Sequence, residues 1–163
     1  MLFSMSTHRT PACLAALALL TIVLAGCGSD GNRSAATTTY FLVAEIDPAN
    51  GDSYIVPISD PTDIAHARRI IQDPDSVAAQ ILVCSIARGS GYGDYVNKDL
   101  VGGRTWSWHV SRFEGFAETT IEILDGGPTS VEENFDAWMQ LTGGQIGFWS
   151  YTVKREVSLE EMR

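Results

Sequence analysis

The stretch Arg104–Val110, RTWSWHV, gathers residue types that can do chemistry. Its serine can donate hydrogen bonds or act as a nucleophile, and its histidine can act as a general base or bind a metal. On a β-strand, alternation would place Trp106 and Trp108 on one face, and Ser107 and His109 on the other. His109 is then either a working residue or a hydrogen-bonded one that braces the sheet, and the second role is the commoner.

Carboxylates follow at Glu122, Asp125 and Glu132. Residues 105–113 and 116–125 are predicted to pair as a hairpin around Glu114-Gly115, which would set His109 roughly opposite Thr120. The diagonal neighbours of that pair would be Glu118 and Glu122. Ser107, His109, Glu122, Asp125 and Glu132 are therefore the candidate polar site.

A histidine beside carboxylates can bind zinc or act as a general base. One hypothesis is thus a metal-assisted or acid–base hydrolase that uses His109 with Glu122 and Asp125. Beyond residue 26, however, the histidines are His66 and His109, on different predicted elements, whereas a catalytic zinc site usually takes two or three. We therefore expect no metal and no catalytic residue here.

The glycine-rich segment Gly89–Gly103 resembles a phosphate-binding loop only superficially. It lacks the Gly-Lys-Ser/Thr of a Walker loop and the third glycine of a dinucleotide loop. We expect no cofactor, and interpret the segment as a surface loop that could bind a ligand.

The first residues predict the location of the protein. An apolar run from Ala12 to Ala25 is shorter than the roughly 20 residues of a transmembrane helix and has the layout of a secretory signal peptide. It ends in Leu24-Ala25-Gly26-Cys27, which resembles the lipobox of bacterial lipoproteins. This resemblance implies cleavage after residue 26, lipid on Cys27, and an extracytoplasmic place in the bacterial cell envelope. Gly28, which is not an aspartate, implies the outer membrane if the cell has one.

Charge and cysteine content narrow the partners. The net charge is −9, and loss of residues 1–26, which contain Arg9 and no acidic residue, would make it −10. Such a chain is unsuited to nucleic acid, whose phosphates need Lys and Arg. With Cys13 in the leader and Cys27 lipidated, Cys84 alone remains, so we predict a fold without disulfides and a buried, unreactive Cys84.

Apolar patterns predict strands over 40–46, 54–59, 80–87 and 147–157, with the third central because both of its faces are apolar. Asp60 is predicted to cap a helix over 60–72 whose His66 faces solvent. Ser130 is predicted to cap a second helix that Gly143 ends. The fold class is α+β: a single domain with an antiparallel or mixed sheet and two packed helices.

These patterns divide the chain into four segments. They are a signal peptide (1–26), the lipidated cysteine with a flexible tether (27–39), the α+β domain (40–157), and a charged tail expected to fray (158–163).

Four segments carry a family resemblance: DPTDIAHARRII, WSWH, IEILDGGPTSVEENF and FWSYTVKREV. In this order and spacing they are similar to the calmodulin-binding-protein-like domain, a family of small secreted bacterial domains, over Tyr40 to Val157. The resemblance implies no established enzyme activity. Calmodulin itself is an unlikely partner, because the chain is acidic and lacks the basic amphipathic helix that calmodulin grips.

The resemblance also implies a lost disulfide. Many relatives carry cysteine where this chain has Leu124, and a second one near the position of Gly147 or Phe148. We therefore expect a non-enzymatic binding or interaction module, attached to the membrane through Cys27, with a protein or small molecule as its ligand.

Cys27→Ser should release the protein into the soluble fraction or leave its leader uncut, because the thiol that accepts the lipid is gone. Metabolic labelling with a radioactive fatty acid checks this, with Cys13→Ser as the matched control. Unchanged labelling in Cys27→Ser would place the anchor elsewhere.

Overall fold

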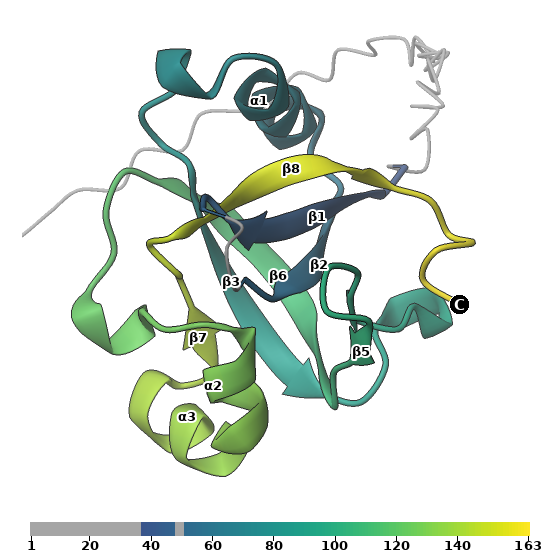
Figure 1. Cartoon of the computed structure of the whole chain (residues 1–163), viewed down its shortest axis with the longest axis vertical. Helices are drawn as coiled ribbons and strands as arrows, with labels where there is room; N and C mark the ends of the chain where they lie inside the picture. Colours follow the sequence, from purple (N-terminus) through teal and green to yellow (C-terminus); the bar gives the residue numbers. More distant parts are fainter. Residues whose placement is uncertain (1–36, 48–50) are drawn as a thin grey trace, which may run out of the picture. The chain divides into compact units, whose positions relative to one another are not determined.

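A computed structural model describes residues 37–47 and 51–163. The predicted signal peptide, Cys27 and residues 28–36 of the tether lie outside the described residues. The described part belongs to one compact unit with an antiparallel α+β fold, as predicted (Figure 1). Among these residues no helix is both long and apolar enough to cross a membrane.

Two three-stranded antiparallel sheets form the framework. The first has the order β2-β1-β8, with β1 at Thr39–Glu45, β2 at Ser53–Ile58 and β8 at Tyr151–Val157. The second has the order β6-β3-β7, with β3 at Ile81–Arg88, β6 at Trp108–Ala117 and β7 at Gln145–Ile146. A short ladder joins β4 (Lys98–Asp99) to β5 (Arg104–Thr105).

The first sheet is buried on both faces, which explains its nearly continuous apolar strands. One face packs into the main core with the second sheet, through side chains such as Phe41, Val56 and Trp108. The other face contributes Leu42 and Ile55 to a smaller cluster, which residues after β3 and the end of the chain complete.

β3 is the central strand of the second sheet, as predicted, and its Cys84 is fully buried. Burial raises the pKa of the Cys84 thiol well above its ordinary value, with a smaller contribution from Glu114, so the thiol stays protonated and unreactive.

The predicted hairpin around Glu114-Gly115 is wrong. β6 runs straight through this pair and stays paired with β3, with Val83 opposite Gly115 and Cys84 opposite Phe113. Glu114 is thus the extra residue of a β-bulge, and Gly115 has the positive φ of 145°. The Glu-Gly signal marks a bulge instead of a turn, because both bend the chain and both favour glycine.

Helix α1 (Pro61–Gln72) begins as predicted: the Asp60 carboxylate accepts the Thr62 N–H at 2.8 Å and the Asp63 N–H at 3.2 Å. His66 does not face solvent, which corrects its prediction. It is half-buried, donates from Nε2 to the Ala79 carbonyl at 2.7 Å, and lies against the Phe116 ring. The longer β6 brings Phe116 under the helix.

The second predicted helix is two helices, α2 (Pro128–Glu133) and α3 (Phe135–Thr142), separated by a nonhelical Asn134. Gly127 takes the N-cap place predicted for Ser130, since Pro128 is well suited to the first helical position. Gly143 ends α3 with a φ of 67°, as predicted. Three single-turn 3₁₀ helices complete the elements: Pro74–Ser76 (η1), Tyr92–Asp94 (η2) and Glu122–Leu124 (η3).

The C-terminal residues are docked, contrary to the frayed tail predicted. Met162 is buried against the outer face of the first sheet. Glu161 pairs with Arg155 at 2.7 Å and accepts the Ser158 N–H at 2.9 Å. These bonds lower the pKa of the Glu161 carboxyl to about 2. The charge pattern hid the one apolar side chain that anchors this segment.

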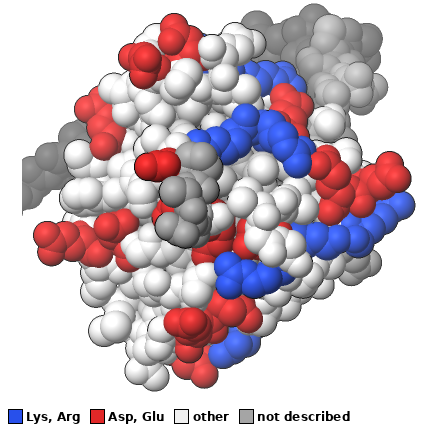
Figure 2. All heavy atoms as spheres, in the orientation of Figure 1, with Lys and Arg blue, Asp and Glu red and all other residues white. Residues whose placement is uncertain are grey.

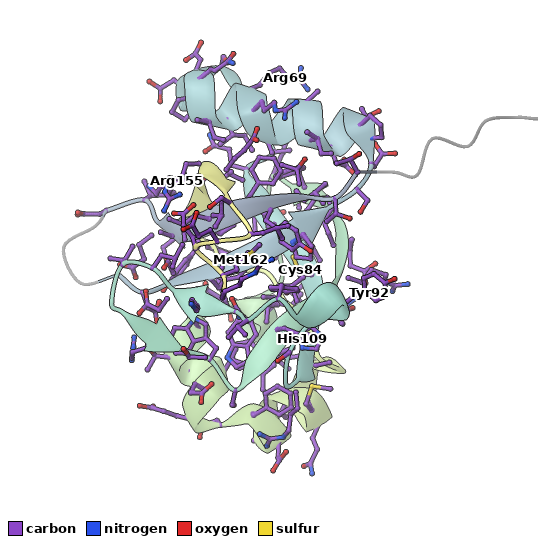
Figure 3. All side chains as sticks on the ribbon, turned by 90° about the vertical axis from the view of Figure 1, so that its right-hand side faces the viewer. Arg69, Cys84, Tyr92, His109, Arg155 and Met162 are labelled. Atoms are coloured by element: carbon purple, nitrogen blue, oxygen red, sulfur yellow. The ribbon has the colours of Figure 1, made fainter. Side chains whose placement is uncertain are left out.

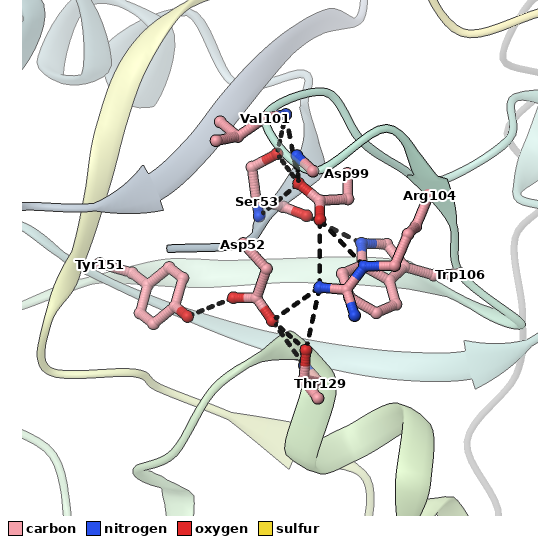
Figure 4. Close-up of polar contacts among 9 residues, drawn as sticks. Asp52, Ser53, Asp99, Val101, Arg104, Trp106, Thr129 and Tyr151 are labelled. Carbon is pink, nitrogen blue, oxygen red and sulfur yellow. Dashed lines mark hydrogen bonds and ion pairs between the residues drawn. The ribbon is translucent and has the colours of Figure 1, made fainter. Parts of the chain in front are cut away.

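A buried carboxylate closes the outer edge of β2 (Figure 4). Asp99 Oδ1 accepts the Ser53 N–H at 3.0 Å, the Ser53 hydroxyl at 2.9 Å and the Gly102 N–H at 2.8 Å. Its Oδ2 faces Arg104 Nη2 at 3.2 Å, and Arg104 lies over the ring of Trp106. This cluster links β2 to the segment between β3 and β6.

Two further bonds extend the closure. Asn97 Oδ1 accepts the Ile55 N–H at 2.9 Å, while its Nδ2 donates to the Trp108 carbonyl at 3.1 Å, so one buried side chain joins both sheets. Next along β2, Pro57 has no N–H to satisfy, and it lies on an edge strand as predicted.

A second buried carboxylate, Asp52, tethers α2. It accepts the Thr129 N–H at 2.8 Å and the Tyr151 hydroxyl, with Arg104 Nη2 at 3.7 Å. Burial first, and then this hydrogen bond, raise the pKa of Tyr151. The half-exposed Arg104 therefore serves two buried carboxylates.

Asp99→Ala should lower the free energy of unfolding by about 3–5 kcal/mol, because it leaves buried donors without their acceptor and Arg104 without its partner. Asp136→Ala is the matched control, because its carboxylate pairs with Arg88 at 2.8 Å while 82% exposed, and should cost about 0–1 kcal/mol. Urea unfolding measures both. Equal costs would mean that Asp99 is not the structural anchor described.

Candidate ligand-binding cleft

The structure joins two of the five predicted site residues. Glu132, on α2, accepts the Ser107 N–H at 2.9 Å and the Ser107 hydroxyl at 3.1 Å. This contact ties α2 to the start of β6. The serine is thus engaged with a carboxylate, but no histidine is bonded to it.

Glu122 and Asp125 lie apart from His109, because the hairpin that would have aligned them does not form. Glu122 is exposed on η3, and Asp125 accepts the Trp149 N–H at 3.1 Å. Thr120, predicted opposite His109, donates instead to the Gly147 carbonyl at 2.8 Å. Within residues 37–47 and 51–163, no group of three or more His, Cys, Asp or Glu side chains could hold a metal.

His109 lies on β6 opposite Ala87, and its Nδ1 is 2.8 Å from the Gly89 carbonyl oxygen. Because a carbonyl only accepts, Nδ1 must bear the proton. The hydrogen-bonded role predicted for this histidine is confirmed, although its partner is the backbone after β3. Its ring also meets Tyr95 edge-on, with the centroids 6.1 Å apart.

His109 opens onto a cleft of about 470 Å³. One wall comes from β6, the other from the ends of β1 and β2 and the start of α1, and η2 closes one side. Tyr92 projects from η2 and is almost fully exposed, on the same side of the molecule as His109 (Figure 3). The lining is aromatic and polar: Thr38, Tyr40, Pro57, Ser59, Asp60, Asp63, Tyr92, Tyr95, His109, Val110, Ser111, Arg112 and Phe113.

The glycine-rich segment positions the tyrosines of this cleft. Tyr95 is buried, donates from its hydroxyl to the Val110 carbonyl at 2.9 Å, and packs on the Tyr40 ring. Burial raises its pKa, so the phenol stays protonated. A Cβ at Gly91 would lie 1.9 Å from the Tyr95 ring, so this position requires glycine. The loop interpretation of the segment is confirmed.

The cleft has an excess of negative charge. Among the described residues, neither Asp60 nor Asp63 forms an ion pair, whereas Arg112 pairs with Glu114 at 2.7 Å. Partial burial, and then the neighbouring Asp60, raise the pKa of the Asp63 carboxyl, with His66 opposing them. The two carboxylates repel each other and would be stabilised by a cation.

The sequence model of the BP-74 N-terminal domain matches residues 37–160. The chain belongs to this family. The match supports the family resemblance seen in the sequence at the level of a domain of this kind. No curated protein and no solved structure matches the chain significantly.

In this member of the family, the positions of the implied lost disulfide are adjacent. The Gly147 N–H donates to the Leu124 carbonyl at 3.1 Å, and Leu124 is buried. An apolar contact and a backbone hydrogen bond thus join the segments that a disulfide would link in relatives. This agrees with the interpretation of the two departures as one paired loss.

The cleft escaped sequence reasoning because its walls are far apart in the chain. The hairpin prediction kept β6 beside residues 116–125 instead of placing it beside η2 and the end of β2. The tyrosines of the glycine-rich segment were the available signal.

His109→Ala should lower the free energy of unfolding by about 1 kcal/mol, the net worth of one hydrogen bond at a half-buried position. Asn97→Ala should cost more, about 2–3 kcal/mol, because it strands the Ile55 N–H and the Trp108 carbonyl inside the protein. Thermal and urea unfolding compare the two variants. A larger loss for His109→Ala would make this histidine chiefly a structural residue.

Proposed function

We propose that the chain is a non-enzymatic binding module whose ligand occupies the cleft between β6, η2 and the end of β2. The observation that supports this most is the lining: a cavity of about 470 Å³ with several aromatic rings and a half-buried histidine at one face. This volume is typical of small-molecule and peptide sites, which bind through rings and a few placed polar groups.

The bonding of His109 favours binding over catalysis. A catalytic histidine is usually oriented by a carboxylate and hydrogen-bonded to a nucleophile. His109 is instead held by the backbone carbonyl of Gly89, and the nearby Ser111 hydroxyl donates to the Ser85 carbonyl at 3.1 Å. The hydrolase alternative, with Glu122 and Asp125, gains no support from the observed positions of these carboxylates.

The lipid anchor is the second part of the proposal. Leu24-Ala25-Gly26-Cys27 supports attachment to the bacterial cell envelope through Cys27, facing away from the cytoplasm and on the outer membrane if the cell has one. A coil of about twelve residues spans roughly 20 Å on average, enough to hold a small domain off the membrane surface.

Charge argues against nucleic acid as the ligand. On the face seen in Figure 2, acidic and basic side chains are intermingled and no broad basic patch is visible. Together with the net charge of −9, this favours a protein, peptide or small molecule as the partner.

The experiment is a ligand-observed NMR screen of the full chain in detergent against short peptides and oligosaccharides. Hits should lose at least about tenfold in affinity with Tyr92→Ala, which removes an exposed ring of the cleft. Leu141→Ala is the matched control, because it removes an exposed apolar side chain from α3, outside the cleft.

Hits should also remain chemically intact during long incubation. Turnover that His109→Ala abolishes would replace the binding module with an enzyme. Hits that bind equally well to Tyr92→Ala would place the site outside the cleft.

A further inference from the structure

We propose that the cleft takes a basic peptide segment in extended conformation, which adds as a strand to the open edge of β6. This inference rests on the proposed function, because it names the ligand class of the same cleft. Its basis is the direction of the backbone groups of β6 together with the charge of the opposite wall.

β6 has one paired and one unpaired edge. It ends its sheet, with β3 as its hydrogen-bonded neighbour among the described strands. The carbonyls of Trp108 and Val110 accept side-chain hydrogen bonds from Asn97 and Tyr95, so they point away from β3. In an antiparallel ladder, alternate residues point to opposite edges, and this fixes the parity of the strand.

Phe113 follows the same rule beyond the bulge. It lies opposite Cys84, which is also paired with Ile146 of β7. The Ile86 N–H, two residues on, donates to Gly144 beside β7, so Cys84 and Ile86 direct their backbone groups toward β7. Phe113 must then direct its own N–H and C=O toward the open edge, where a ligand strand can bond to both.

The cleft follows this edge. Five consecutive residues, 109–113, line it, although successive side chains of a strand point to opposite faces. A hollow lined by consecutive residues must therefore run along the edge of the strand. Five residues of strand span about 17 Å, the length of a short peptide.

The facing strand cannot compete for this role. The Ser53 and Ile55 N–H groups on the edge of β2 already bond to Asp99 and Asn97, and Pro57 has no N–H. The edge of β2 is thus closed, whereas the backbone groups of Phe113 on β6 remain open to the cleft. Strand addition to such an edge is a recurrent mode of peptide recognition.

Charge selects the ligand. Asp60 and Asp63 have no cationic partner among the described residues, and the charge of Arg112 is balanced by Glu114. His109 and the more distant His66 are the other titratable imidazoles near these walls. A Lys or Arg side chain of the ligand would meet both carboxylates and the exposed ring of Tyr92, which also favours a cation.

The test uses the full chain in detergent and a capped peptide of about seven residues with alternating valine and lysine, compared with a valine–glutamate peptide. Calorimetry should show binding of the lysine peptide and at least tenfold weaker binding of the glutamate peptide. Asp63→Asn should weaken the lysine peptide about fivefold to tenfold. Asp75→Asn, an exposed carboxylate outside the cleft, should not change it.

N-methylation of the peptide at single positions tests the strand pairing. Methylation should abolish binding at alternate residues and be tolerated at those between, and the bound peptide should slow hydrogen exchange of the Phe113 amide about tenfold. Equal binding of the glutamate peptide, tolerance of every N-methyl group, or prior protection of Phe113 by a second copy or by the tether would overturn the proposal. Library hits that need Tyr92 would still support the cleft, so the two failures are distinguishable.

Discussion

The structure depends on the acceptance of β2 backbone donors by buried polar side chains. Asp99 and Asn97 lie on a segment that is otherwise without long strands, yet they satisfy Ser53 and Ile55 more than 40 residues away along the chain. An unsatisfied buried N–H costs about 1–3 kcal/mol, so this segment has a strong reason to stay against β2. Arg104 then offsets part of the buried negative charge from the solvent side.

The cleft is a consequence of this closure. By fixing Asn97 and Asp99 against β2, the protein also fixes Tyr95, whose hydroxyl reaches β6, and places η2 with its exposed Tyr92 beside His109. The same contacts that close one strand edge thus form the wall of a hollow beside another. Within this domain family, recognition can therefore change through the η2 segment without a change in the two sheets.

Local patterns predicted much of the fold. The strands β1, β2 and β3, the Asp60 cap, the buried tryptophan face and the αL end at Gly143 all follow from propensities that act within a few residues. The hairpin failed because Glu114-Gly115 fits a bulge as well as a turn, and the choice depends on whether β3 extends far enough to pair with both halves. The pairing of Asp52 with Thr129 and Tyr151 joins residues far apart in the chain, and no local pattern marks such a network.

The same distinction explains the candidate site. His109 was found because its residue type is rare and its strand alternates, and its hydrogen-bonded state was predicted correctly. Its neighbours could not be predicted, since Tyr92, Asp63 and Pro57 reach it through the packing of three separate elements.

Native-state hydrogen exchange, measured amide by amide, tests the central role of the buried acceptors most directly. The Ser53 and Ile55 amides point to the outer edge of β2, and they should be protected as strongly as the amides between β1 and β2, while the ligand-free Phe113 amide exchanges rapidly. Rapid exchange at Ser53 and Ile55, at rates like that of Phe113, would show that Asp99 and Asn97 do not close this edge.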